Sequence, residues 1–157
     1  GDYTFSLTVT DDGEDQSNAY NSEDLFISEY ADASSSGDRY VEIYNGMENT
    51  VDLSEYSIKI YKNNSSGTIY ELDLDNESGG SYNSGNLASG ETLLIVKSDS
   101  GNDLLELLDA NGNQNEDYDD VQFIEYTTMS NMGDDAFELL HNGVRIDVIG
   151  TPENYGR

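Results

Sequence analysis

Hydrophobic residues in this chain are gathered into short blocks that polar, Gly- and Ser-containing stretches separate. From residue 25 onward a block begins about every 10–15 residues, a spacing typical of the strands of a β-sandwich or barrel. Alternation of apolar and polar positions predicts strands at residues 25–31, 39–45, 56–62, 68–74 and 121–126. The continuous apolar run at residues 92–96 predicts a central strand that is buried on both faces.

Two pairs of blocks are separated by turn residues and predict β-hairpins. Residues 56–62 and 68–74 flank a polar stretch at 63–67, and residues 136–149 carry Asn142-Gly143 at their centre. Asn-Gly between alternating hydrophobic residues is the strongest short-range indication of a two-residue hairpin turn. Counting outward from it pairs His141 with Val144 and Leu140 with Arg145.

The same count places Glu138 directly opposite Asp147 in the closing hairpin. Like charges at opposed positions of two strands are destabilising. We therefore expect the two carboxylates to splay into water, with Arg145 as the nearby partner of Asp147.

The chain before residue 25 differs from the rest in pattern. Residues 3–10 alternate like a half-buried strand, and residues 11–24 are acidic and polar. We therefore divide the chain into an N-terminal strand with an acidic linker, residues 1–24, and a main domain, residues 25–157. One short helix is predicted within the main domain, at residues 102–109, where four leucines form an apolar stripe.

Composition narrows the possible functions. The chain has 33 acidic and 6 basic residues and a net charge of −27, which argues against general binding to nucleic acid or anionic lipid. With no Cys there is no disulfide or thiolate metal site, and a single His makes a Ser-His-Asp triad improbable. That residue, His141, flanks the predicted turn, and we expect it to be exposed. No apolar run approaches the ~20 residues that span a bilayer, so no transmembrane segment is predicted.

Six segments resemble, in sequence order, the lamin tail domain family in its bacterial form. They are LFISEY at 25–30 with RYVEIYN at 39–45, VDLSEY at 51–56, NLASGETLLIV at 86–96, NMGDDAFELL at 131–140, and GVRIDVIG at 143–150. The resemblance covers most of the chain. It implies an all-β, immunoglobulin-like β-sandwich with one short helix.

The resemblance also implies a class of function. Bacterial members of the family are accessory modules of secreted or envelope-attached proteins, and nuclear members contact proteins and sometimes DNA. We know of no catalytic residues in the family to transfer, and the acidity argues against the DNA role. We therefore expect a non-catalytic interaction module, extracellular or in the cell envelope, that binds another protein or a surface polymer and not nucleic acid.

Two tyrosines are the candidate binding residues. Tyr40 and Tyr44 lie on the strand face opposite Val41 and Ile43. If that face is open to water, the two rings form an aromatic contact surface. The alternative is that they belong to the core or to cross-strand packing, since Tyr is a good strand former.

The acid excess suggests a solvated surface, adaptation to high salt, or calcium binding. For calcium, oxygen-bearing side chains fall at positions 1, 3, 5, 7, 9 and 12 of residues 109–120, as in EF-hand-type loops. The six candidate ligands are Asp109, Asn111, Asn113, Asn115, Asp117 and Asp120. Gln114 stands where such loops have Gly, and the favoured interpretation of the stretch is a helix-ending Asn-Gly turn followed by a solvated acidic loop. The alternative function is therefore a calcium-stabilised structural domain of a larger extracellular protein.

Overall fold

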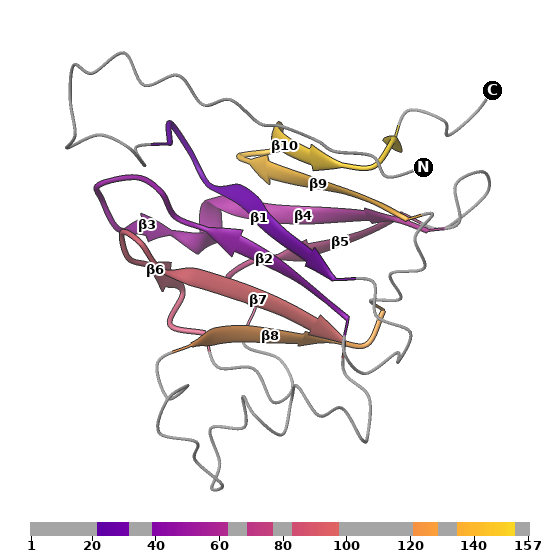
Figure 1. Ribbon diagram of the computed structural model, residues 1–157, viewed down its shortest axis with the longest axis horizontal. Helices are drawn as coiled ribbons and strands as arrows, with labels where there is room; N and C mark the ends of the chain where they lie inside the picture. The colour runs from indigo at the N-terminus through magenta and orange to yellow at the C-terminus, as the bar shows by residue number, and fades with distance from the viewer. Residues whose placement is uncertain are drawn as a thin grey trace, which may run out of the picture.

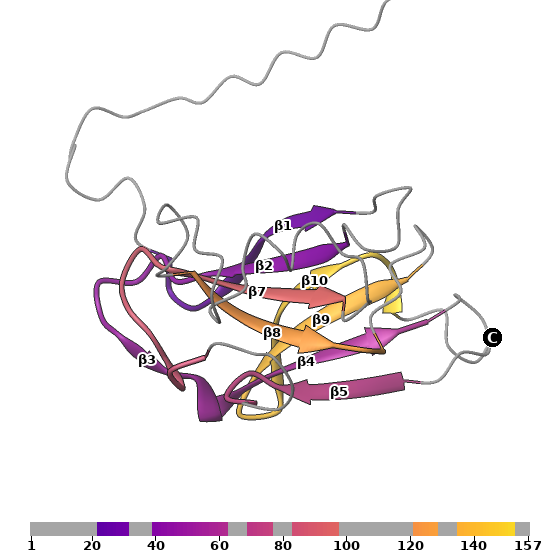
Figure 2. The ribbon, with the colours of Figure 1, turned by 90° about the horizontal axis from the view of Figure 1, so that it is seen from below.

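Two four-stranded sheets face each other in the computed structural model, which describes residues 22–31, 39–62, 69–76, 83–97, 121–128 and 135–152 (Figures 1 and 2). The first sheet has the order β1-β2-β7-β8 and the second the order β10-β9-β4-β5. All pairs are antiparallel except β7 with β8. A two-stranded sheet, β3-β6, and the 3-10 helix η2 complete the described fold. The bounds are β1 Phe26–Ala31, β2 Tyr40–Tyr44, β3 Val51–Asp52, η2 Leu53–Glu55, β4 Tyr56–Tyr61, β5 Ile69–Asp73, β6 Asn86–Leu87, β7 Thr92–Lys97, β8 Gln122–Tyr126, β9 Ala136–His141 and β10 Val144–Ile149.

This architecture confirms the predicted all-β, immunoglobulin-like sandwich. The two predicted hairpins form as β4-β5 and β9-β10, and β7 lies in the interior of its sheet, as its continuous apolar run predicts. Residues 3–10 and the predicted helix at residues 102–109 lie outside the described residues. The small β3-β6 sheet was not predicted, since two-residue strands are too short to leave a periodic pattern.

The core lies between the two sheets and follows from strand alternation. In β2 the side chains of Val41 and Ile43 are fully buried, while those of Tyr40, Glu42 and Tyr44 are half-buried on the outer face. The second sheet contributes its own inward-facing side chains, such as Ile58, Ile60, Phe137 and Leu139, to the same cluster. Each large apolar side chain buried in this way contributes about 1.5–3 kcal/mol.

The closing hairpin begins as predicted and then departs from the predicted register. His141 pairs with Val144 and Leu140 with Arg145, but Leu139 pairs with Asp147 because β10 has a bulge between Arg145 and Asp147. A bulge adds one residue to a strand and shifts every later pair. The prediction that Glu138 lies opposite Asp147 is therefore wrong, and Glu138 lies opposite Val148.

The partner predicted for Arg145 is also wrong. Arg145 Nη1 lies 3.0 Å from Glu138 Oε1, and the Tyr61 hydroxyl donates to Glu138 Oε2 at 2.6 Å. Burial, followed by this hydrogen bond, raises the pKa of Tyr61 to about 12. Relief from like-charge repulsion thus comes from the bulge, which separates the two acids and gives each its own partners.

The bulge turns Asp147 toward the other sheet. Its Oδ2 accepts a hydrogen bond from the Ile27 amide of β1 at 2.8 Å, and its Oδ1 accepts one from the Val148 amide at 2.8 Å. The strand β1 has its own irregularity between Ile27 and Glu29. One carboxylate therefore joins the edge strands β1 and β10 and satisfies an edge amide that would otherwise need another partner.

Candidate functional site

The two predicted binding residues lie on the outer face of the first sheet, at opposite ends of β2. Tyr44 is paired with Phe26 of β1, and the two rings meet edge to face with centroids 5.4 Å apart. Tyr40 packs against a second, smaller apolar cluster around Val96 and Phe123. Both tyrosines are half-buried, so each ring packs on its neighbours and keeps part of its surface in contact with solvent.

Acidic side chains lie between the two tyrosines on this face. Glu29 of β1 is paired with Glu42 of β2. Ser28 Oγ donates to Glu42 Oε1 at 2.6 Å. Burial, with a hydrogen bond to Glu29, raises the pKa of Tyr40 to about 12. We call these side chains, Phe26, Glu29, Tyr40, Glu42 and Tyr44, the aromatic-acidic face.

All six candidate calcium ligands at residues 109–120 lie outside the described residues. Within the described ranges, no group of three or more His, Cys, Asp or Glu side chains is arranged to hold a metal ion. The calcium loop therefore remains a prediction from the sequence.

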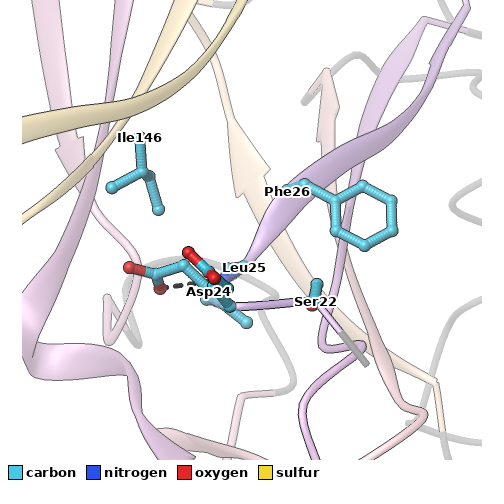
Figure 3. Close-up of a pocket in the computed structure, with 6 residues that line it drawn as sticks. Ser22, Asp24, Leu25, Phe26 and Ile146 are labelled. Carbon is cyan, nitrogen blue, oxygen red and sulfur yellow. Dashed lines mark hydrogen bonds between the residues drawn. The ribbon is translucent and has the colours of Figure 1, made fainter. Parts of the chain in front are cut away.

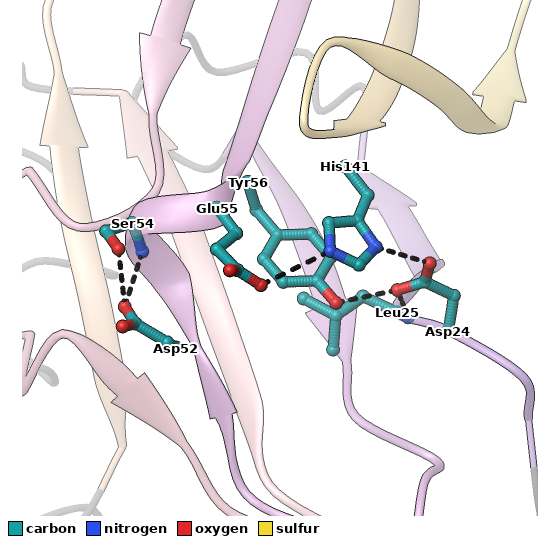
Figure 4. Close-up of polar contacts among 7 residues, drawn as sticks. All are labelled: Asp24, Leu25, Asp52, Ser54, Glu55, Tyr56 and His141. Carbon is teal, nitrogen blue, oxygen red and sulfur yellow. Dashed lines mark hydrogen bonds and ion pairs between the residues drawn. The ribbon is translucent and has the colours of Figure 1, made fainter.

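A polar cluster around the single histidine was not predicted (Figure 4). His141 Nδ1 lies 2.8 Å from Asp24 Oδ2, and its Nε2 lies 3.4 Å from Glu55 Oε2. The imidazole stacks on the Tyr56 ring with centroids 4.3 Å apart. The expectation that His141 is simply exposed beside the turn is wrong, because its side chain keeps only 31% of its surface exposed.

Local structure brings these four residues together. Asp52 caps η2 by accepting hydrogen bonds from the Ser54 amide and hydroxyl, which turns the chain so that Glu55 and Tyr56 follow in succession. The Asn142 amide then donates to the Glu55 carbonyl at 2.8 Å and holds the hairpin tip against η2. The cluster therefore joins η2, β4, the β9-β10 turn and the segment before β1.

Electrostatics favour a charged pair at the centre of this cluster. The hydrogen bond that His141 donates to Asp24, together with the nearby Glu55, raises the pKa of His141 above its usual value. Burial raises the pKa of Asp24, but hydrogen bonds from His141, the Tyr56 hydroxyl and the Leu25 amide outweigh it and lower that pKa overall. Burial and the bond to Asp24 also raise the pKa of Tyr56.

These four residues, Asp24, Glu55, Tyr56 and His141, form a set of linked contacts that we call the clasp. Both imidazole nitrogens face carboxylates, so in the imidazolium form each can donate to a carboxylate oxygen. The Asp24 carboxylate is already used by the Leu25 amide, the Tyr56 hydroxyl and His141. The cluster fixes the start of β1 to the second sheet.

Sequence reasoning missed the cluster because its members are far apart along the chain. Asp24 and His141 are separated by 117 residues. The pairing of β4 with β9 places Tyr56 beside His141, and no local pattern in the sequence indicates that pairing.

A shallow hollow of about 440 Å³ lies at the start of β1, next to the clasp (Figure 3). Ser22, Glu23, Asp24, Leu25 and Phe26 line it from one side, and Ile146 at the β10 bulge lines it from the other. Among the lining residues, Asp24 also belongs to the clasp, where its carboxylate accepts from the Leu25 amide, the Tyr56 hydroxyl and His141. The hollow therefore lies where the start of β1 meets the bulged part of β10.

The clasp predicts a pH dependence of stability. Because the folded-state pKa of His141 is raised, its contribution is complete below about pH 6.5 and is lost as the pH rises through the folded value. The contribution of Asp24 to stability depends on pH in the opposite direction, because it is lost as the pH falls through the lowered pKa of Asp24. We expect the free energy of unfolding to fall by about 0.5–1 kcal/mol between pH 6 and 9, a magnitude typical of a partly exposed ion pair.

The control for this prediction is His141→Phe, which keeps a ring over Tyr56 but carries no proton. Urea unfolding should show less loss above pH 6 for the variant than for the wild type. Since His141 is the only His, its NMR titration gives the folded pKa directly. A measured pKa below 6.5, or equal slopes for both proteins, would contradict the clasp.

Comparison with known proteins gives one family and no curated relative. A family model described as the Lamin Tail Domain matches residues 18–153. A search of curated proteins found no match. Within the described residues, no helix is long and apolar enough to cross a membrane.

Proposed function

Because the chain belongs to the Lamin Tail Domain family, whose immunoglobulin-like domains are non-catalytic interaction modules, we propose that it binds another protein as an accessory module of a secreted or cell-envelope protein. The observation that carries the proposal is the aromatic-acidic face. Phe26 and Tyr44 form a half-buried aromatic pair beside exposed and half-buried carboxylates. Partly exposed aromatic side chains are typical anchors of protein interfaces.

Several observations support a binding role without catalysis. The only histidine has both nitrogens engaged by carboxylates, and the chain has no Cys. The net charge of −27 supports a protein partner over nucleic acid. Secretion or envelope attachment is proposed from the resemblance to bacterial family members. The calcium-stabilised alternative rests on the spacing of residues 109–120.

Selection from a displayed peptide library tests the binding role. We expect the domain to enrich peptides whose binding is lost in the double variant Tyr40→Ser/Tyr44→Ser. The matched control is Tyr70→Ser on β5 of the other sheet, since Tyr70 is also half-buried. Circular dichroism checks that the variants stay folded. Enriched peptides that bind the double variant and the wild type equally would contradict the assignment of this face.

A further inference from the structure

Two carboxylates on the second sheet have basic partners: Lys59 Nζ lies 3.7 Å from Glu71 Oε2, and Arg145 Nη1 lies 3.0 Å from Glu138 Oε1. On the first sheet, Glu29 and Glu42 are directly paired across β1 and β2. The ion pairs found among the described residues do not include either of them.

The partners of Glu29 and Glu42 are hydroxyl groups. Ser28 donates to Glu42 at 2.6 Å, and Tyr40 bonds Glu29. A hydroxyl satisfies a lone pair but brings no positive charge, so two opposed carboxylates keep their mutual repulsion. Glu29 is exposed and Glu42 is half-buried. A cation placed between them would be attracted by both carboxylates.

Aromatic rings lie close to this acidic pair on the same face. Residues that face the same side of a strand alternate with a period of two, so Tyr40, Glu42 and Tyr44 lie in one row of β2. Phe26 packs against Tyr44 from β1. Guanidinium groups stack on aromatic faces and pair with carboxylates through a planar fork of donors, which makes arginine a better match to this face than lysine.

We propose that the aromatic-acidic face binds an arginine-bearing basic segment of a partner protein, with a guanidinium between Glu29 and Glu42 and against the neighbouring tyrosine rings. This inference rests on the proposed function and names the chemistry of its partner. The proposal is based on charge complementarity. The net charge of −27 attracts a basic segment to the domain, and the pair of Glu29 and Glu42 is the place where its guanidinium binds.

Calorimetric titration with a synthetic peptide of alternating Arg and Gly, about ten residues long, tests the proposal at a salt concentration near 0.15 M, where long-range attraction is screened. We expect binding to weaken about tenfold in Glu29→Gln/Glu42→Gln, since truncating close charge partners at an interface costs at least that much. The matched control is Asp73→Asn/Asp75→Asn, which removes two charges from exposed residues at the end of β5. It should change the affinity less than about twofold, since charges away from the contact act mainly through screened attraction.

Two further measurements test the aromatic contact and the preference for arginine over lysine. Tyr44→Leu keeps an apolar side chain against Phe26 and should still weaken the Arg peptide, while a Lys-Gly peptide should bind the wild type less tightly than the Arg-Gly peptide. Equal losses in the two charge variants, or no heat of binding at this salt concentration, would overturn the proposal. If library selection yields non-basic peptides that need Tyr40 and Tyr44, the binding role stands and the basic partner is wrong.

Discussion

Asn45→Ala should destabilise the domain by about 3 kcal/mol, because it leaves three backbone groups without their partner. Asn45 is fully buried, and its side-chain amide donates to the Asn49 carbonyl and the Leu87 carbonyl, each at 2.9 Å. Its Oδ1 accepts from the Met47 amide at 3.0 Å. One side chain therefore ties the loop after β2 to β6. Buried polar groups that lose a partner cost about 1–3 kcal/mol each.

Urea unfolding measures this loss, and two variants make it specific. Asn45→Asp has nearly the same volume but places an oxygen against both carbonyls, so it should destabilise at least as much as alanine. Asn49→Ala changes an exposed side chain while keeping the carbonyl that Asn45 contacts, and should cost less than about 0.5 kcal/mol. If Asn45→Asp behaved like the wild type, the hydrogen bonds would not be the source of the stability.

Local sequence patterns predicted the features of this fold that depend on residues close together in the chain. Alternation placed Val41 and Ile43 inside because a strand turns successive side chains to opposite faces. Asn142-Gly143 predicted the closing turn because both residues tolerate positive φ, and both adopt it, at 49° and 75°. The first two pairs of the hairpin followed from the turn alone.

Features that depend on distant partners were not predictable in this way. The β10 bulge lets Asp147 reach the Ile27 amide 120 residues away, and no count outward from the turn contains that contact. The clasp likewise needs Asp24 and His141 from opposite ends of the domain. On the aromatic-acidic face, the two tyrosines were found by alternation, but Glu29 joined them only through the pairing of β1 with β2.

The second large effect is expected from Gly150→Ala, which should cost about 3 kcal/mol. Gly150 has a φ of +85°, and a Cβ built there would lie 2.8 Å from the Ala136 Cβ and 3.0 Å from the Asp135 carbonyl oxygen. A left-handed backbone costs a residue with a Cβ about 1–2 kcal/mol. Overpacking adds about 1–3 kcal/mol, because backbone and a buried Ala136 must shift rather than the end of a flexible side chain.

Gly90→Ala separates the two contributions, because Gly90 has nearly the same φ of +80° but no atom within 4 Å of a built Cβ. It should cost about 1 kcal/mol, the strain alone. Urea unfolding of both variants then gives the cost of close approach as their difference. A difference near zero would mean that β9 and β10 yield where Gly150 meets Ala136. A difference of about 2 kcal/mol would mean that this contact fixes the end of β10, the strand whose bulge places Asp147 at the seam with β1.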